Sequence, residues 1–242
     1  MNALLANFLK SAFRGVGLEV SRFSRSPEAN LLSIKHRPIG TIIDVGANEG
    51  QFAQMISRFF PSATLIAFEP QQDAFEVLDR WAATRPGKVK CFNKAVGETE
   101  GSLMMHKHIH HYSSSSILRS TDAHTALTPA SEAQAMIPIQ MVTLDGFFSQ
   151  SGLEMPTDIL VKMDVQGYED RVISGARETL RKAKVVIVEV CLDTFYEDQA
   201  RFETIVSKCG ELGLRYGGNL NQAYAKDGHV QVIDAVFLRE GK

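Results

Sequence analysis

Cysteine is scarce in this sequence, which limits both its redox chemistry and its metal chemistry. The 242 residues contain three cysteines, Cys91, Cys191 and Cys209, at unequal spacing. An odd number without regular spacing argues against a disulfide framework, and none of the three has the close spacing of a metal-ligand pair. This cysteine use is typical of a reducing compartment, so we expect a cytoplasmic protein with small, buried cysteines.

Long hydrophobic runs and an excess of one charge are also missing. No stretch of about 18 apolar residues occurs, so we expect no transmembrane segment. The N-terminus lacks a positively charged start and a small-residue cleavage site, so we expect no secretory signal. A formal net charge of −2 gives no bulk attraction to nucleic acid. With 44% hydrophobic residues, the chain can bury a sizeable core.

The dinucleotide-binding pattern G-x-G-x-x-G is missing as well, although a related turn is present. Residues 41–45 read Thr-Ile-Ile-Asp-Val, a short apolar run with a carboxylate at its end, and the turn Gly-Ala-Asn-Glu-Gly follows. A carboxylate repels a pyrophosphate but attracts the cationic sulfonium and the amino group of S-adenosylmethionine. The turn therefore favours S-adenosylmethionine over NAD as the cofactor.

Apolar strands alternate with amphipathic helices along most of the chain. The expected strands are residues 41–45, 63–68, 88–92, 159–164, 185–190 and 232–238, with an edge strand near 137–141 and a further strand within 214–226. The expected helices are residues 51–60, 73–83, 145–151, 169–182 and 200–212. This alternation predicts a mostly parallel sheet with helices on both faces. No helix is evident between the last two strands, which predicts a terminal antiparallel hairpin.

Two segments interrupt the alternation. Residues 1–38 are basic, carry apolar residues at helical spacing and end at Pro38, so we expect a helical appendage. It would pack on the main domain or on a second subunit, which makes a homo-oligomer possible through this segment; peripheral membrane contact is the alternative. Residues 101–135 hold four histidines and a serine run, and we expect an irregular loop that acts as a lid. The main domain would then span residues 39–242.

Carboxylates at the ends of three strands define the candidate site. Asp44 ends the first strand and would hold the cofactor amino group, directly or through water. Glu69 ends the second strand, 23 residues after Gly46, near the spacing at which an acid binds ribose hydroxyls. Asp164 ends the fourth strand, which lies beside the first in the usual order, and would hold the amine or accept a proton from a hydroxyl.

Other polar residues have two possible interpretations each. Glu189 lies in an apolar strand, where it needs a partner such as Lys162 or belongs to the site. Asn93 would meet the adenine edge or form an ordinary turn. The histidines lack fixed carboxylates or cysteines nearby, so we expect them on the surface or in a substrate loop, where one can act as a base, and we expect no metal site. They are His106, His108, His110 and His111.

Together these segments resemble the FkbM family of S-adenosylmethionine-dependent methyltransferases. The resemblance runs from residue 41 to about residue 215 and rests on six segments. They are Asp44-Val-Gly-Ala-Asn-Glu-Gly50, Phe68-Glu-Pro70, Asn93-Lys-Ala95, the serines that end at Ser116, Thr143-Leu-Asp145 and Lys162-Met-Asp-Val-Gln-Gly-Tyr-Glu169. Gln166 and Tyr168 depart from the family, which often has an acid and a small residue at these positions.

The resemblance implies a class I methyltransferase fold of the α/β class. This is a Rossmann-like, three-layer αβα sandwich around a seven-stranded, mostly parallel sheet with a terminal antiparallel hairpin. It also implies that S-adenosylmethionine methylates a hydroxyl of a saccharide or secondary metabolite, so that the partner is a small-molecule or glycan acceptor. By this resemblance Glu69 binds ribose, and Asp164 lies at the reacting centre as the catalytic residue. The residues at the methionine end and near adenine are Asp44, Gly46, Asn48, Gly50, Asn93 and Ala95.

Two other functions remain compatible with the same segments. A methyltransferase-like domain without activity would bind the cofactor and serve as a binding module. An NAD(P)-dependent oxidoreductase or epimerase is less favoured, because its glycine pattern is missing.

Overall fold

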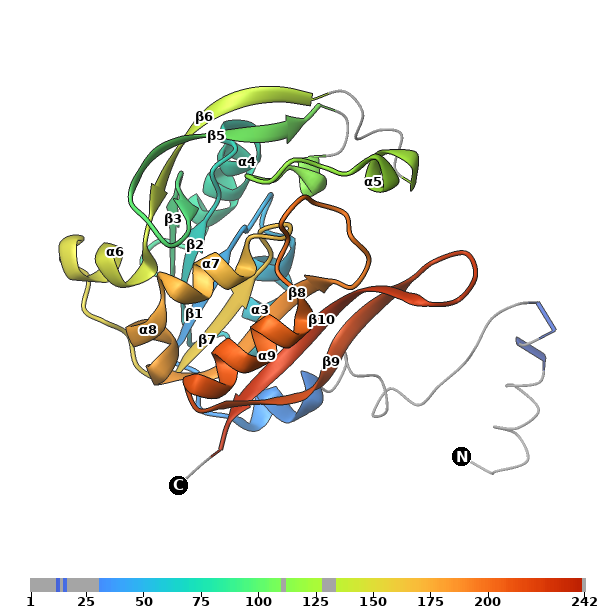
Figure 1. Cartoon of the computed structure of the whole chain (residues 1–242). Helices are drawn as coiled ribbons and strands as arrows, with labels where there is room; N and C mark the ends of the chain where they lie inside the picture. The colour runs from blue at the N-terminus through green and yellow to red at the C-terminus, as the bar shows by residue number, and fades with distance from the viewer. Residues whose placement is uncertain (1–11, 14, 17–30, 110–111, 128–133, 241–242) are drawn as a thin grey trace.

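A seven-stranded sheet forms the centre of the molecule, with helices on both faces (Figure 1). The computed structural model describes residues 12–13, 15–16, 31–109, 112–127 and 134–240. The strand order is β3-β2-β1-β7-β8-β10-β9. The strands are β1 (Thr41–Val45), β2 (Thr64–Phe68), β3 (Val89–Phe92), β7 (Ile159–Met163), β8 (Ala183–Cys191), β9 (Leu214–Tyr224) and β10 (Val230–Arg239). All neighbours are parallel except β10, which runs antiparallel to both β8 and β9. The expected sheet and terminal hairpin are confirmed.

Alternating side chains give the sheet two apolar faces, because successive residues of a strand point to opposite sides. In β1, Ile43 and Val45 pack on one face, whereas Ile42 packs on the other. The first face is covered by α6 (Leu144–Gln150), α7 (Glu169–Ser174), α8 (Arg177–Lys182) and α9 (Phe202–Glu211). The second is covered by α3 (Gln51–Phe59) and α4 (Gln72–Ala83). These layers form the predicted three-layer sandwich.

The helix expected over residues 169–182 is in fact two short helices, α7 and α8. The break falls at Gly175, where a Cβ atom would lie 1.9 Å from the carbonyl oxygen of Gly97. The chain therefore passes directly against another backbone segment at this point. Apolar spacing continues across the break, which is why the sequence pattern alone predicts one helix.

A second, three-stranded sheet includes both ends of the segment over which an irregular loop was expected, residues 101–135. Strand β5 (Gly101–His108) pairs antiparallel with β6 (Gln134–Val142), which also pairs with β4 (Ala95–Val96). Strand β6 is therefore central in this sheet and not an edge strand. The pairing joins segments about 30 residues apart, a contact that local sequence patterns do not reveal. Helices η3 (Tyr112–Ser114) and α5 (Asp122–Leu127) follow β5.

The last turns of the N-terminal segment contribute to the core, whereas the described residues 12–13 and 15–16 are exposed. Leu31 and Ile34 of the 3₁₀ helix η2 (Leu31–His36) are fully buried in the second apolar face. These side chains complete the core, so we propose that the main domain begins at or before Leu31, ahead of the boundary expected at residue 38. The helical appendage and the subunit contact proposed for it lie mostly outside the described residues. No helix in the described ranges is both long and apolar enough to span a membrane.

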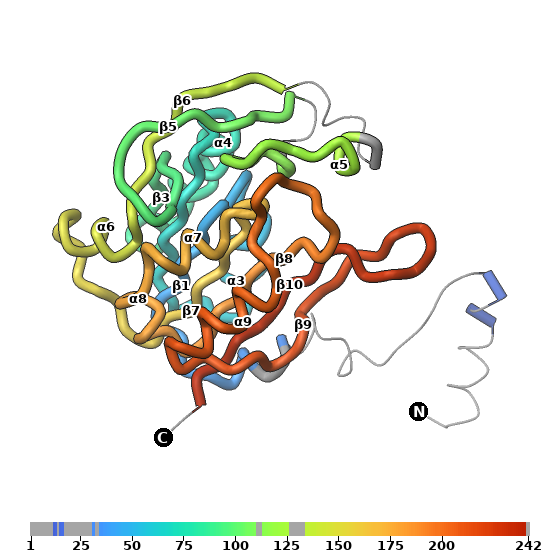
Figure 2. The backbone as a smooth tube through the Cα atoms, viewed as in Figure 1, coloured from blue at the N-terminus to red at the C-terminus, as the bar shows by residue number. Residues whose placement is uncertain are grey.

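The β9–β10 hairpin extends beyond the sheet as a separate arm (Figure 2). His229 near its tip lies between two carboxylates, 3.0 Å from Asp193 and 2.6 Å from Asp227. Gln231 donates a further hydrogen bond to Asp193. These contacts tie the hairpin to the loop that follows β8.

Candidate active site

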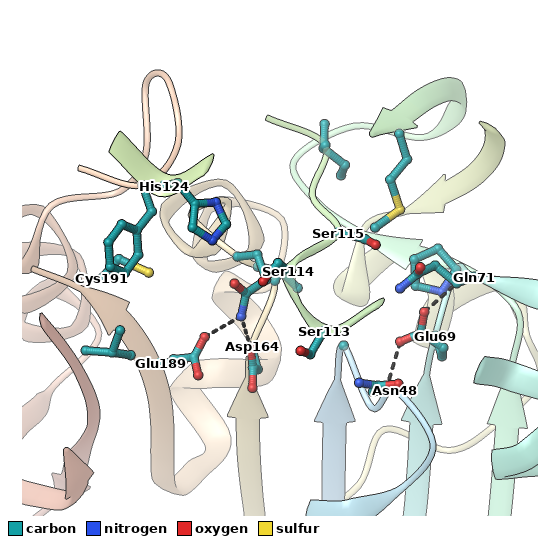
Figure 3. A pocket seen from close by; sticks show the side chains of 18 of the residues that line it. Asn48, Glu69, Gln71, Ser113, Ser114, Ser115, His124, Asp164, Glu189 and Cys191 are labelled. Atoms are coloured by element: carbon teal, nitrogen blue, oxygen red, sulfur yellow. Dashed lines mark hydrogen bonds between the residues drawn. The ribbon is translucent and has the colours of Figure 1, made fainter. Parts of the chain in front are cut away.

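A cavity of about 500 Å³ lies at the carboxyl end of the main sheet. Its floor is formed by the tips of β1, β2, β7 and β8, and its roof by segments that follow β5 (Figure 3). In an open α/β sheet, ligands bind at this edge, where the connections from neighbouring strands diverge. The volume falls within the range of small-molecule sites.

The turn after β1 brings its backbone unusually close to β7. Gly46 has a φ of +77°, and a Cβ atom there would lie 1.9 Å from the carbonyl oxygen of Asp164. Only glycine fits this conformation and this contact. Gly46 and Asn48 line the cavity, as predicted. Gly50 instead precedes α3, where a Cβ atom would contact Leu78, and it is outside the cavity lining that the described residues define.

Asp44 faces the helical layer beneath the cavity. Its side chain is 1% exposed and accepts a hydrogen bond from the backbone N–H of Ala53, in the first turn of α3. Burial raises its pKa to about 7. Asp44 is not among the residues that form the described cavity wall. The structure therefore places this carboxylate at the start of α3, where a negative charge suits the helix dipole.

Glu69 presents a fixed carboxylate to the cavity. One oxygen accepts from the N–H of Asn48 and the other from the N–H of Gln71, each at 2.8 Å (Figure 3). The side chain is 3% exposed, and burial raises its pKa to about 7 although both bonds oppose the rise. Each oxygen keeps acceptor capacity for a ligand hydroxyl. Charge, position and remaining acceptor capacity fit a ribose-binding group.

Asn93 and Ala95 have different positions. Asn93 donates to the carbonyl oxygens of Glu69 at 3.0 Å and Pro70 at 3.1 Å, and it lies outside the described lining. It thereby fixes the chain that carries Glu69. Ala95 begins β4 and lines the cavity, as predicted.

Asp164 and Glu189 lie together at the opposite end of the cavity (Figure 3). The buried Lys162 lies 3.1 Å from Asp164 and 3.4 Å from Asp234. Its ammonium holds the pKa of Asp164 below the usual value despite burial, whereas burial and the charge of Asp164 raise the pKa of Glu189 well above it. Glu189 accepts a hydrogen bond from the side-chain amide of Gln166, whereas the ion pairs described for Lys162 are with Asp164 and Asp234.

The roof of the cavity contains residues that the sequence analysis did not place in the site. Ser113, Ser114, Ser115 and His124 line the cavity from above. Tyr224 and Lys226 reach it from the hairpin, and Phe195 from the loop after β8. The serine run and the histidines drew attention to the segment that forms the roof. No local sequence pattern predicted that the hairpin or the loop after β8 would reach the cavity.

Of the cluster expected on the surface or in a substrate loop, the described histidines His106 and His108 lie in strand β5. His108 is fully buried, and its Nε2 lies 3.0 Å from Ser120 Oγ. His106 belongs to β5, and its backbone exchanges two hydrogen bonds with Ser116. Strand pairing buries His108 fully and leaves His106 partly exposed. His110 and His111 lie outside the described residues. In the described ranges, no group of three or more histidine, cysteine, aspartate or glutamate side chains is arranged to hold a metal ion.

The fold and this site define a class. A sheet of this order, a glycine turn after β1 and an acid at the tip of β2 are the features of a Rossmann-like class I methyltransferase. The sequence model of the methyltransferase FkbM domain matches residues 44–216, which is most of the chain. The chain belongs to this family and is a methyltransferase, which confirms the resemblance.

Individual relatives are distant. The 2-O-methyltransferase NoeI of Sinorhizobium fredii is 26% identical over 195 residues, covering 78% of this chain and 79% of the relative. The hexuronic acid methyltransferase AglP of Haloferax volcanii is 27% identical over 147 residues, covering 61% of this chain and 54% of the relative. Among solved structures, a precorrin-6y C5,15-methyltransferase from Geobacter metallireducens has 11% identity and a TM-score of 0.42, covering 87% of this chain and 84% of that one.

Proposed function

We propose that this methyltransferase uses S-adenosylmethionine to methylate a hydroxyl group of a saccharide. The observation that carries the proposal is the pairing of two acidic groups in one cavity. Glu69, held by two backbone amides, faces the cavity at one end, and Asp164, held by Lys162, faces it at the other. Glu69 can bind the hydroxyl groups of a nucleoside, and Asp164 can accept the proton of a reacting hydroxyl group.

The donor would occupy the end of the cavity beside β1 and β2. Glu69 would accept hydrogen bonds from the ribose hydroxyls, Gly46 and Asn48 would border the methionine part, and Ala95 would border adenine. When bound, S-adenosylmethionine supplies an electrophilic methyl group on a cationic sulfur. Asp44, Gly50 and Asn93 would support this end from outside the cavity wall, through α3 and through the segment that carries Glu69.

Asp164 is the proposed catalytic residue. As a carboxylate it would accept the proton of the acceptor hydroxyl, which makes the oxygen a better nucleophile. Lys162 would keep Asp164 ionised at neutral pH, because the ammonium favours its charged form. Holding the hydroxyl in line with the methyl group would supply much of the rate enhancement.

The acceptor is proposed from two sources. Both named relatives are methyltransferases, one for a 2-O position and one for hexuronic acid. The acceptor half of the cavity combines hydroxyl groups with aromatic rings, the combination that suits a sugar: Ser113, Ser114, Phe195 and Tyr224. The roof formed by residues 112–127 would act as the lid that limits water at the reacting atoms.

Donor binding is tested first. We expect Glu69→Ala to abolish measurable binding of S-adenosylmethionine and S-adenosylhomocysteine, because both ribose hydroxyls lose a charge-assisted acceptor. Isothermal titration calorimetry measures this, with Glu49→Ala as the control, an exposed carboxylate of the same turn. Wild-type affinity in Glu69→Ala would reject the ribose role. A thermal shift with NAD or NADP, and none with S-adenosylhomocysteine, would favour an oxidoreductase.

Catalysis is tested with a panel of saccharide hydroxyl acceptors that includes neutral hexosides and hexuronates. We expect Asp164→Asn to lower kcat by about 100-fold or more, since a general base is lost, while calorimetry still detects S-adenosylhomocysteine. Unchanged turnover in Asp164→Asn would refute the base role. Tight donor binding without turnover on any saccharide would favour the alternative of a binding module.

A further inference from the structure

Gln166 has an unusual backbone conformation beside the proposed base. It follows Asp164 by two positions, and its φ is +56°, in the left-handed region. A residue with a Cβ atom adopts this region at a free-energy cost, so the surrounding contacts hold it there. Ser116 Oγ donates to its carbonyl oxygen at 2.7 Å, which ties this strained turn to the roof.

The side-chain amide of Gln166 bridges two carboxyl groups on adjacent strands. Its Nε2 donates to Asp164 Oδ1 at 2.8 Å and also to Glu189 Oε2, as the dashed lines in Figure 3 show. An amide nitrogen carries two hydrogens, so one serves each carboxyl group. Both carboxyl groups therefore accept from the same nitrogen atom, which places them side by side at this end of the cavity.

Tyr196 fixes which way this amide points. Its hydroxyl is buried and donates to Gln166 Oε1 at 2.7 Å, and it lies 3.0 Å from the Ser114 carbonyl oxygen in the roof. If the amide rotated by half a turn, its oxygen would face the two carboxyl groups and its NH₂ would face the tyrosine. That arrangement would remove the donors from both acids, so the observed orientation is the favourable one.

We propose that Gln166 is a positioning residue that holds Asp164 and Glu189 as a pair carrying one shared proton, with Asp164 as the ionised member. Two buried carboxyl groups that accept from one amide nitrogen lie too close together for both to ionise readily, because their charges repel. Lys162 contacts Asp164 directly, so the negative charge is favoured there and the proton resides on Glu189. The role of Asp164 as base rests on the proposed function, but the shared proton does not.

The charged groups around the pair support this assignment. From β7 and β10, Lys162 and Asp234 face each other at 3.4 Å. From β1 and α7, Asp44 and Glu169 have pKa values raised to about 7 by burial, so they add little negative charge below that pH. Burial also raises the pKa of the Cys191 thiol and of the Tyr196 hydroxyl, which keeps both neutral.

An amide at position 166 therefore has a defined purpose. It supplies two donors without adding a third acid to a site that already holds Asp164 and Glu189. During methyl transfer the hydroxyl O–H bond breaks and its proton moves to Asp164, while Glu189 keeps its own proton. A carboxyl group at this position would remove both donors and compete for the same charge.

The test is a ¹³C NMR titration of side-chain carboxyl groups in the full chain, labelled at aspartate and glutamate. The signals are assigned with Asp164→Asn and Glu189→Gln. In the wild type, Glu189 should titrate well above the usual range and Asp164 below it. In Gln166→Met, the pKa of Asp164 should rise by about 1, because its ionised form loses a hydrogen bond. Gln140→Met, at an exposed glutamine of β6, is the matched control and should change neither titration.

Tyr196→Phe provides a second, independent variant. It keeps the amide but removes the group that orients it, so the pKa of Asp164 should rise by less than in Gln166→Met. If Asp164 titrates as in the wild type in both variants, or if Glu189 ionises before Asp164 in the wild type, the proposal is overturned. The titration needs neither donor nor acceptor, so its result stands apart from the outcome of the turnover assay.

Discussion

At the scale of single residues, the acids of the site differ because their neighbours differ. Glu69 is held by two backbone amides, Asp164 by an ammonium, and Glu189 by an amide side chain, while the charge of Asp164 acts against its ionisation. Backbone amides and a cation favour the charged form, whereas burial and a like charge oppose it. The cavity therefore contains the ionised carboxylate of Asp164 at one end. At the other end it contains Glu69, which takes up a proton near neutral pH.

Gly46 is a second single residue on which the geometry of the site depends. We expect Gly46→Ala to lower the free energy of unfolding by roughly 3 kcal/mol, from the left-handed backbone and from overlap with the Asp164 carbonyl oxygen. Gly87→Ala is the matched control, because Gly87 has a similar φ of +75° with nothing within 4 Å of the added Cβ. It should lose only about 1 kcal/mol. Urea unfolding measures both, and equal losses would show that the close contact with β7 is unimportant.

At the scale of elements, α6 and α8 are joined by one carboxylate. Asp145 of α6 accepts from the backbone N–H groups of Glu178 and Thr179, each at 2.8 Å, and from Thr179 Oγ1 at 2.7 Å. These N–H groups lie in the first turn of α8, where no partner exists within the helix. Asp145 thus caps a helix from a distant part of the chain. This gives the Thr143-Leu-Asp145 segment a structural role.

Removal of this cap is expected to loosen the layer that supports β7 and β8. Asp145→Ala should lower the free energy of unfolding by about 2 kcal/mol, because the donors in the first turn of α8 lose a charged acceptor. Asp145→Asn keeps one acceptor oxygen and should lose less. Glu154→Ala, at an exposed carboxylate nearby, should stay within about 0.5 kcal/mol of the wild type. An equal effect of Asp145→Ala and Glu154→Ala in urea would contradict the capping role.

At the scale of the whole molecule, buried acids link stability to pH. Asp44, Glu69 and Glu169 have folded-state pKa values raised to about 7, while unfolded chains titrate near pH 4. Between these values the folded state binds more protons than the unfolded state, so stability falls as pH rises. The pKa of His229 is also raised, by its bonds to Asp193 and Asp227, and its contribution is lost as pH rises through that value.

We therefore expect the ligand-free protein to be more stable at pH 5.5 than at pH 8. Asp164 has the opposite sign, because its pKa is lowered, but its contribution is lost only as pH falls below about 4. The urea midpoint at several pH values measures the trend. Glu169→Gln should flatten it, since one of the carboxyl groups with a raised pKa is removed. A midpoint that is constant or rises between pH 5.5 and pH 8 would refute the linkage.

Much of this molecule follows from local sequence patterns. Apolar runs predicted every strand of the main sheet, because alternating and continuous hydrophobicity reports which faces are buried. Acids at the ends of these runs predicted that Glu69 and Asp164 would share an edge of the sheet, since parallel strands end at the same side. The glycine turn predicted a close backbone approach, and family motifs predicted the class of enzyme.

The remaining features depend on which distant segments pack together. Asp44 supports α3 because that helix covers the face to which its side chain points, and no residue near Asp44 encodes that choice. The roof depends on the pairing of β5 with β6, and the hairpin reaches the cavity only when β9 and β10 are in register. Nothing in the local sequence shows that the side chain of Gln166 connects Asp164 and Glu189, because this contact forms only when β7 and β8 lie side by side. Local periodicity determines elements, whereas packing free energy summed over the whole chain determines their contacts.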